Sequence, residues 1–239
     1  MEIKIRILPK RVLRILILTI LILLIGQILF LVTQFFYGYS FRHFFLIFNF
    51  DNEGFVPTLY STFAILFAAL LLLVVSIIKY AQKEKDKVYW FLLFVIFCLL
   101  AYDEAAEVHE GFNEYFWDSP YLPTWLGFGW VIPYSILVLI IGVFFIKFLK
   151  SLPKKISLLF LISGLIFISG AIGMELPGAY LWFNTGGFNS LYYNLAATVE
   201  ELLEMLGIAV FIYAILKYLE IYCGPNVIIV FRTPDKELN

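Results

Sequence analysis

The sequence has little charge for its length. Only 15% of its 239 residues are charged, whereas 62% are hydrophobic. A soluble domain is about one quarter charged and about one half apolar. The composition therefore excludes an ordinary soluble protein and indicates a polytopic membrane protein.

Cysteine and histidine are also scarce, with two of each. Cys98 lies in an apolar run and Cys223 in the polar tail, so neither a disulfide framework nor a CxxC metal pair is available. Two histidines cannot form a three-histidine zinc site, and His109-Glu110 is not followed by the second histidine of a HExxH protease. No P-loop, dinucleotide fingerprint or Gly-x-Gly-Asp protease motif is present, and we expect no nucleic-acid partner.

Long apolar runs are what the sequence has in abundance. They predict an all-α fold, a bundle of six transmembrane helices, because about 20 apolar residues cross a bilayer. No small-residue cleavage site follows the first run, so we expect it to be retained as a span. The expected domain covers 1–220 and a short cytoplasmic tail covers 221–239. The predicted spans are about 12–32, 59–78, 88–110, 130–149, 156–176 and 191–219.

The distribution of charge predicts the orientation. Of the 17 Lys and Arg residues, 16 fall at the N-terminal segment, the two connections 79–87 and 147–155, and the C-terminal segment. Cytoplasmic loops are enriched in Lys and Arg, so both termini are predicted to be cytoplasmic. We expect the protein in the plasma membrane of a prokaryote. The acids are distributed the opposite way, with 12 of 18 on the outer side.

Acidic residues interrupt three of the apolar runs. DEAAEVHE at 103–110 closes the third run, Glu175 closes the fifth, and EELLE at 200–204 lies in the sixth. If the third helix continues, its acids form one stripe with Glu104 and His109 beside it. That stripe would hold Asp103, Glu107, Glu110 and Glu114.

Ionisable groups within a membrane are costly and indicate function by default. Carboxylates that lie together either hold protons or are neutralised by a cation. The only bases on that side are Arg42, His43 and His109, so a bound metal, bound protons or a cationic ligand is implied. Of these, we expect a divalent metal ion. Oxygen ligands favour Mg, Ca or Mn, with Fe or Zn as less favoured alternatives. The predicted ligands and supporting groups are Asp103, Glu104, Glu107, His109, Glu110, Glu175, Glu200, Glu201 and Glu204.

Some of these residues also have a plain structural interpretation. Glu114 and Asp118 would need no partner in headgroup water, and His109 fits an interfacial histidine as well as a ligand. Asp51 and Glu53 are interpreted as loop or cap residues.

Three motifs together resemble a widespread group of prokaryotic multi-pass membrane proteins of unknown function. They are DNEGFVPTLYS at 51–61, DEAAEVHE at 103–110 and VEELLEMLG at 199–207. The resemblance spans most of the chain from Asp51 to Gly207 and implies no activity.

Three functions remain open at this point. The acids could bind a cation or relay protons, as in a transporter. They could hold a metal in a membrane enzyme that acts on a lipid-like substrate. They could also line a polar vestibule in a structural or sensory module. The inner halves of the spans are nearly all apolar, which argues against a path through the membrane and favours a site open only to the outside. The bilayer is the one certain partner, with a small-molecule or lipid ligand as a further expectation.

Overall fold

Six long apolar helices form the body of the computed structural model, which describes residues 2–37, 44–52, 54–111, 123, 126–223 and 227–232. Alone or with the helical segments that continue it, each is long and apolar enough to cross a membrane. The chain is therefore a multi-pass membrane protein, as predicted. The helices are α1 (Pro9–Val32), α3 (Val56–Ala81), α4 (Lys87–Ala106), α7 (Val131–Ser151), α8 (Lys154–Ile168) and α10 (Leu191–Cys223).

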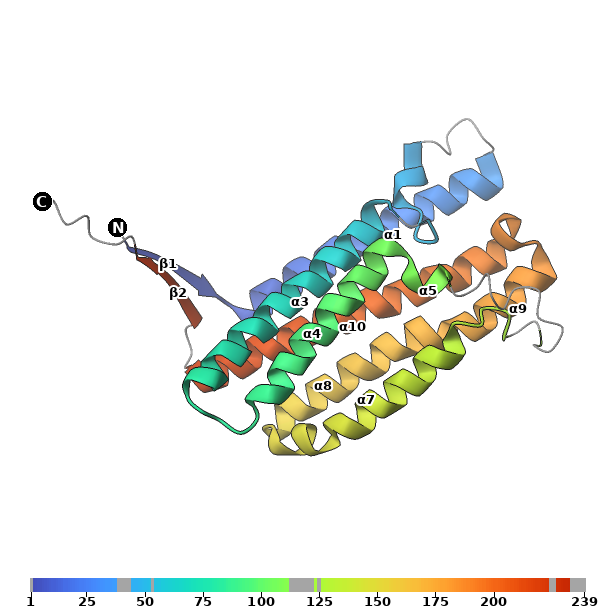
Figure 1. Cartoon of the computed structure of the whole chain (residues 1–239). Coiled ribbons are helices and arrows are strands. Elements are labelled where there is room, and N and C mark those ends of the chain that lie inside the picture. The colour runs from blue at the N-terminus through green and yellow to red at the C-terminus, as the bar shows by residue number, and fades with distance from the viewer. Residues whose placement is uncertain are drawn as a thin grey trace, which may run out of the picture.

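Helix α10 is the centre of the bundle. It packs against α1, α3 and α8 (Figure 1) and is the most buried of the six. Its residues Ile212, Ile215 and Leu216 are fully buried. Helices α4 and α7 are the least buried, so they lie at the periphery.

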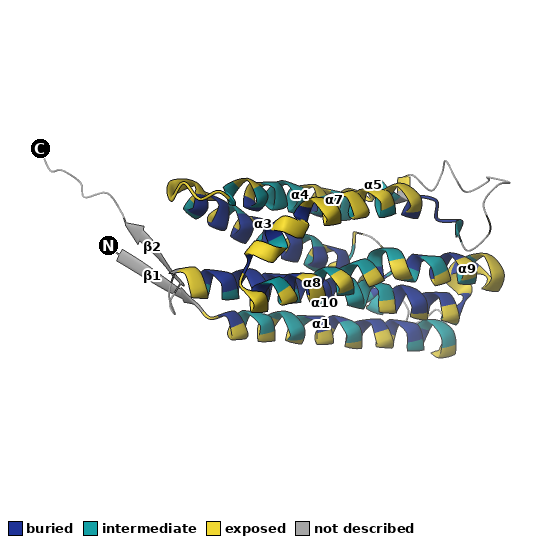
Figure 2. Cartoon of the chain, turned by 90° about the horizontal axis from the view of Figure 1, so that it is seen from below, coloured by how far each residue is buried: buried dark blue, intermediate teal, exposed yellow. Residues whose placement is uncertain are grey.

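The outer faces of the helices carry large apolar side chains. Leu139 of α7 and Leu165 of α8 are each more than 60% exposed, and Figure 2 shows exposed residues along the length of the helices. In a bilayer this exposure is not a liability, because lipid tails are as apolar as a protein interior. The exposed surface therefore agrees with a membrane protein.

The two ends of the chain form a small sheet that the sequence analysis did not predict. Strand β1 (Glu2–Ile7) pairs antiparallel with β2 (Val227–Arg232), with Glu2 opposite Arg232 and Ile7 opposite Val227. The short apolar run in the tail is thus a strand. Both terminal segments lie at one end of the bundle (Figure 1).

The third span ends earlier than predicted. Helix α4 stops at Ala106, and Glu107 adopts a left-handed conformation with φ 53°. Such a residue terminates a helix, usually as glycine. A short helix, α5 (Val108–Gly111), follows in a new direction. The expected continuous stripe from Asp103 to Glu110 is therefore wrong.

The fifth span is longer than predicted. After α8 the chain passes through a π-helix, η4 (Ser169–Met174), and continues as α9 (Glu175–Thr185), so that 154–185 form one candidate span. The predicted span ended at about residue 176. Its helix ends instead at Gly186, whose φ of 100° suits glycine.

Short elements complete the end opposite the termini. α1 runs on into a π-helix, η1 (Thr33–Tyr37), and two 3-10 turns follow later in the chain, η2 (Leu46–Phe48) and η5 (Gly187–Asn189). Gly26 of α1 lies under the ring of Phe48, where a Cβ atom would come within 2.5 Å. Glycine at this position lets η2 pack directly on α1.

Candidate functional site

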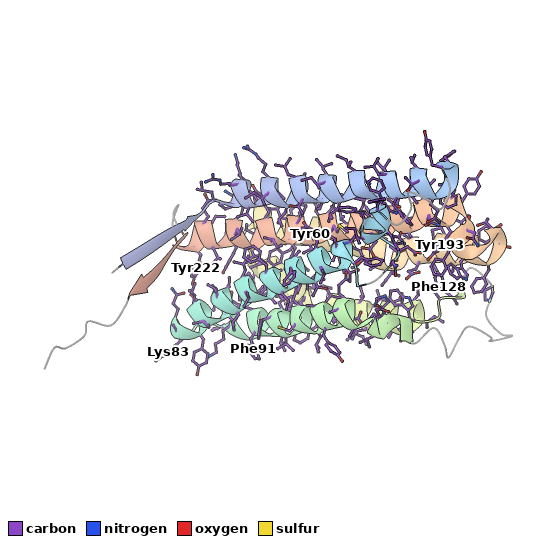
Figure 3. The ribbon with its side chains drawn as sticks, turned by 90° about the horizontal axis from the view of Figure 1, so that it is seen from above. Tyr60, Lys83, Phe91, Phe128, Tyr193 and Tyr222 are labelled. Carbon is purple, nitrogen blue, oxygen red and sulfur yellow. The ribbon has the colours of Figure 1, made fainter. Side chains whose placement is uncertain are left out.

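A cavity of about 750 Å³ lies among α4, α5, α7, η4, α9 and α10. It is located toward the end of the bundle marked by Phe128 and Tyr193, away from Lys83 and Tyr222 at the other end (Figure 3). Its size is typical of a site for a small molecule. Eight acidic residues line it, namely Asp51, Asp103, Glu104, Glu107, Glu175, Glu200, Glu201 and Glu204.

The described lining contains no lysine or arginine, and His109 is the one histidine in it. The remaining lining residues are mainly aromatic and aliphatic, including Phe128, Trp130 and Trp182. Negative charge in such surroundings is costly without a positive partner. The composition of the cavity therefore favours a positively charged occupant.

Helix α10 contributes three acids to the cavity, Glu200, Glu201 and Glu204. Neighbouring helices approach α10 closely at this point. A Cβ atom at Gly170 of η4 would lie 2.7 Å from the backbone oxygen of Glu200 and 3.0 Å from Cγ of Glu204. One turn further on, a Cβ atom at Gly207 would lie 2.8 Å from the backbone of Phe167. Small residues thus permit close approach of the helices beside the acids. π-helical turns such as η4 frequently occur at functional sites.

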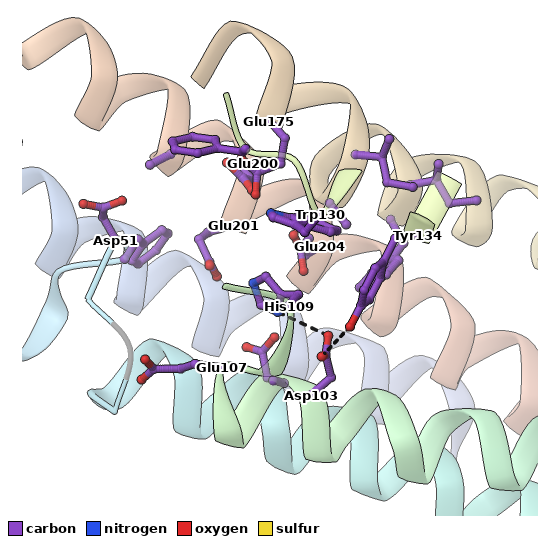
Figure 4. Close-up of a pocket in the computed structure, with 18 of the residues that line it drawn as sticks. Asp51, Asp103, Glu107, His109, Trp130, Tyr134, Glu175, Glu200, Glu201 and Glu204 are labelled. Carbon is purple, nitrogen blue, oxygen red and sulfur yellow. Dashed lines mark hydrogen bonds and ion pairs between the residues drawn. The ribbon is translucent and has the colours of Figure 1, made fainter. Parts of the chain in front are cut away.

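A closed ring of four side chains forms the opposite wall of the cavity (Figure 4). Asp103 accepts a 2.8 Å hydrogen bond from the Tyr134 hydroxyl and interacts with Nδ1 of His109 at 3.2 Å. The Trp130 ring contacts both His109 and Tyr134, at centroid distances of 4.9 and 5.0 Å. An ionised carboxylate only accepts hydrogen bonds, so Nδ1 of His109 is the donor when Asp103 is ionised. The ring fastens α4 and α5 to α7.

The break at Glu107 makes this ring possible. On a continuous helix, residues six apart are separated by about 240° and cannot meet. The left-handed Glu107 turns α5 back, so that His109 reaches Asp103. The prediction of a continuous helix therefore placed His109 away from Asp103, whereas the two side chains are in contact.

Asp51 was missed as a lining residue and was interpreted as a loop or cap residue. Its carboxylate accepts a 2.6 Å hydrogen bond from Tyr193 of α10, and the cap position of α3 is Phe55. The two residues are 142 positions apart. No local pattern could have joined them.

Gln27 holds the Asp51 turn in place. Its side chain is fully buried, donates to Thr198 of α10 at 2.8 Å and accepts from the backbone N–H of Phe50 at 3.2 Å. Both polar ends of the amide are thus satisfied inside the bundle, as buried polar groups require. A glutamine in the apolar part of α1 was a signal for this contact, although it could not identify the partner.

The structure brings most of the predicted ligands together around one cavity: Asp103, Glu104, Glu107, His109, Glu175, Glu200, Glu201 and Glu204. The side chain of Glu110 and the whole of Glu114 lie outside the described residues. Within the described part of the chain, no three His, Cys, Asp or Glu side chains form a group that could hold a metal ion. The acids are distributed over the walls of the cavity and do not converge on one point (Figure 4).

Comparison with known families gives one match. A model described as a domain of unknown function, DUF8692, matches residues 14–218. The chain belongs to the DUF8692 family. The match covers the four middle candidate spans, most of the first and last, and every residue of the acidic lining. The DUF8692 domain thus agrees with the expected membership of a family of unknown function. No curated protein and no solved structure matches the chain.

Proposed function

We propose that this membrane protein binds a cationic ligand in the cavity lined by the acids. The observation that carries the proposal is the composition of that cavity: eight acidic residues, one histidine and no lysine or arginine among the described lining residues. Carboxylates enclosed in an apolar bundle gain stability from an added positive charge, because the protein itself supplies so little there.

A divalent metal ion is the ligand that the sequence predicted, although no three described His, Cys, Asp or Glu side chains are grouped to hold one. Carboxylate oxygens suit Mg, Ca or Mn, and His109 adds one nitrogen for Fe or Zn. The volume of about 750 Å³ is far larger than one ion needs. A metal here would leave room for a substrate, which favours a membrane enzyme that acts on a lipid-like molecule. In that enzyme the metal would supply Lewis acidity, and the acids would have to move together to hold it.

An organic cation is the second candidate, favoured by the aromatic side chains. Trp130 and Tyr134 form one wall and Trp182 and Tyr193 form another. Aromatic faces attract amines and quaternary ammonium groups, as carboxylates do. Acids spread over several walls suit a ligand with more than one positive centre better than they suit a single ion.

Transport is the less favoured alternative. Between the cavity and the basic end of the bundle, apolar residues such as Ala68, Leu72 and Ile212 are fully buried. A cation would need a polar route there. This packing supports a site that is reached from one side only. We further propose that this side faces outward and that both termini are cytoplasmic, in the plasma membrane of a prokaryote.

The experiment measures the melting temperature of the purified protein with each cation class. Mn, Mg and Ca salts, a chelator, a polyamine and a quaternary ammonium compound are added in turn. A ligand at a hundred times its dissociation constant stabilises the folded state by about 2.7 kcal/mol. Glu204→Gln should remove this response, because the amide keeps the shape of the side chain without its charge.

The matched control is Glu84→Gln, which changes an exposed acid in the connection between α3 and α4. It should leave the response unchanged. If the acids share protons instead, Glu204→Gln should stabilise the protein without any added cation, because it relieves repulsion between neighbours. A wild-type protein that responds to none of these cations and to no chelator contradicts the proposal and leaves the structural or sensory module.

A further inference from the structure

A second cavity, of about 440 Å³, lies where α1 begins and α10 ends. This is the end of the bundle that carries the terminal segments (Figure 1). Four basic side chains and one acidic side chain line it together with Leu8. The charged residues are Lys10, Arg11, Arg14, Lys217 and Glu220.

Within the described part of the chain, most of this positive charge has no acidic partner. Lys217 is paired with Glu220. Among the described residues, no acidic side chain forms an ion pair with Lys10, Arg11 or Arg14. Three cationic groups around one concave surface favour an anionic ligand with several acceptor oxygens, and a phosphate group has that chemistry.

The face of α1 below the pocket shows which kind of phosphate compound fits. Arg11 and Arg14 share one face of the helix with Ile15, Leu18 and Ile22, because these positions are spaced by three and four residues. The three apolar side chains are 57%, 53% and 63% exposed. A stripe of lipid-facing residues therefore continues directly from the two arginines into the membrane.

The length of that stripe matches one leaflet. Ile25 continues it and is 58% exposed. From Arg14 to Ile25 the helix rises about 16 Å. This is about half of the hydrocarbon thickness, which is about 30 Å. The acyl chains of one lipid would lie along the stripe while its headgroup reached the pocket. A soluble phosphate compound would make no use of the stripe.

We propose that this basic pocket binds the phosphate headgroup of an anionic phospholipid whose acyl chains lie along the exposed face of α1. The ligand and the residues differ from those of the acidic cavity, so this inference does not depend on the proposed function. Basic pockets between helices at the membrane surface recognise anionic headgroups through the same chemistry.

The test uses the full chain, purified in a neutral detergent and stripped of lipid. Phosphatidylglycerol, phosphatidylcholine of the same chain length and glycerol phosphate are titrated separately, and binding is followed by native mass spectrometry and by melting temperature. Phosphatidylglycerol should bind at least about tenfold more tightly than phosphatidylcholine, since each base near the surface contributes severalfold. Glycerol phosphate should bind weakly, because it lacks the acyl chains.

Variants locate the site. Arg11→Gln with Arg14→Gln should weaken phosphatidylglycerol binding by about tenfold or more. Lys83→Gln with Lys85→Gln removes the same charge from exposed positions in the α3–α4 connection, outside the pocket, and should not weaken it. Leu18→Ser should weaken binding of the lipid and leave that of glycerol phosphate unchanged.

Three results would overturn the proposal. Equal binding of the two phospholipids would show that the anionic headgroup is not recognised. Glycerol phosphate that binds as tightly as phosphatidylglycerol would make the pocket a site for soluble phosphates. Equal losses in the arginine and lysine variants would reduce the effect to general surface charge. If the double variant fails to fold, Arg14→Gln alone, at an exposed position, gives the same comparison.

Discussion

The hydroxyl of Tyr193 donates a 2.6 Å hydrogen bond to the carboxylate of Asp51. This bond joins the turn before α3 to the start of α10, across 142 residues. Gln27 supports the same junction from α1 through Phe50 and Thr198. One wall of the acidic cavity is therefore held by polar contacts between three parts of the chain that are distant in sequence.

Tyr193→Phe should destabilise the protein, because it removes a donor from an enclosed carboxylate. The expected loss is about 0.6 to 2 kcal/mol, the range between a typical hydrogen bond in a membrane protein and one to a charged group. Thermal unfolding in detergent measures it. Tyr192→Phe is the matched control, since Tyr192 is 69% exposed, and should be silent.

The pair can be tested further with Asp51→Asn. If Tyr193 and Asp51 stabilise the fold through each other, the double variant should lose less than the two single variants together. Additive losses would show that Tyr193 and Asp51 have no interaction energy between them.

Glu107→Gly should stabilise the protein although it removes a side chain. Glu107 has φ 53°, a conformation that costs about 1 to 2 kcal/mol for a residue with a Cβ atom and little for glycine. After the entropy that glycine loses on folding, a net gain of up to about 1 kcal/mol is expected. Glu107→Ala keeps the strain and should show no such gain.

Lys83 provides the comparison, because it has φ 57° in the connection between α3 and α4. Lys83→Gly should give a similar gain at the opposite end of the bundle. Only Glu107→Gly should also weaken the response to a cation, since Glu107 lines the acidic cavity and Lys83 does not. If both variants changed that response equally, Glu107 would have no specific part in ligand binding.

The sequence predicted the helices well because apolar length alone decides whether a segment can span a bilayer. It predicted that Glu175 and the acids of α10 would share one site with those of α4, and they line one cavity. It did not predict the break at Glu107. A left-handed residue is identified by its backbone, and a glutamate there gives no signal of the kind that glycine would.

Contacts between residues that are far apart in the chain also could not be predicted from the sequence. Asp51 resembles an ordinary loop residue until Tyr193 is brought beside it. The strand pairing of β1 with β2 joins the two ends of the chain. Both contacts depend on partners that no local sequence pattern defines. The length of the fifth span was underestimated for a different reason. Pro177 and Gly178 are typical of a loop, although they lie within α9.

The orientation of the bundle is tested by labelling intact cells with a membrane-impermeant thiol reagent. Cys98 and Cys223 are first replaced by serine. A cysteine introduced at the exposed Asn184 should then be labelled, and one at the exposed Lys85 should be spared. A cysteine introduced at Ser119, which lies outside the described residues, should be labelled as well. Labelling of Lys85→Cys with protection of Asn184→Cys would reverse the orientation and place the acidic cavity on the cytoplasmic side.

Gly170→Ala tests the close contact on which the acidic cavity depends. The added methyl group would lie 2.7 Å from the backbone oxygen of Glu200 and 3.0 Å from Cγ of Glu204, so η4 and α10 must separate. Overpacking of this kind costs about 1 to 3 kcal/mol, and the displaced acids should also bind a cation less tightly. Gly164→Ala is the control in the same span, because a Cβ atom there meets nothing within 4 Å. It should be neutral or slightly stabilising, since alanine favours the helix. If both substitutions lower the melting temperature equally, the effect belongs to the span as a whole, and the contact between Gly170 and α10 does not set the position of Glu200 and Glu204.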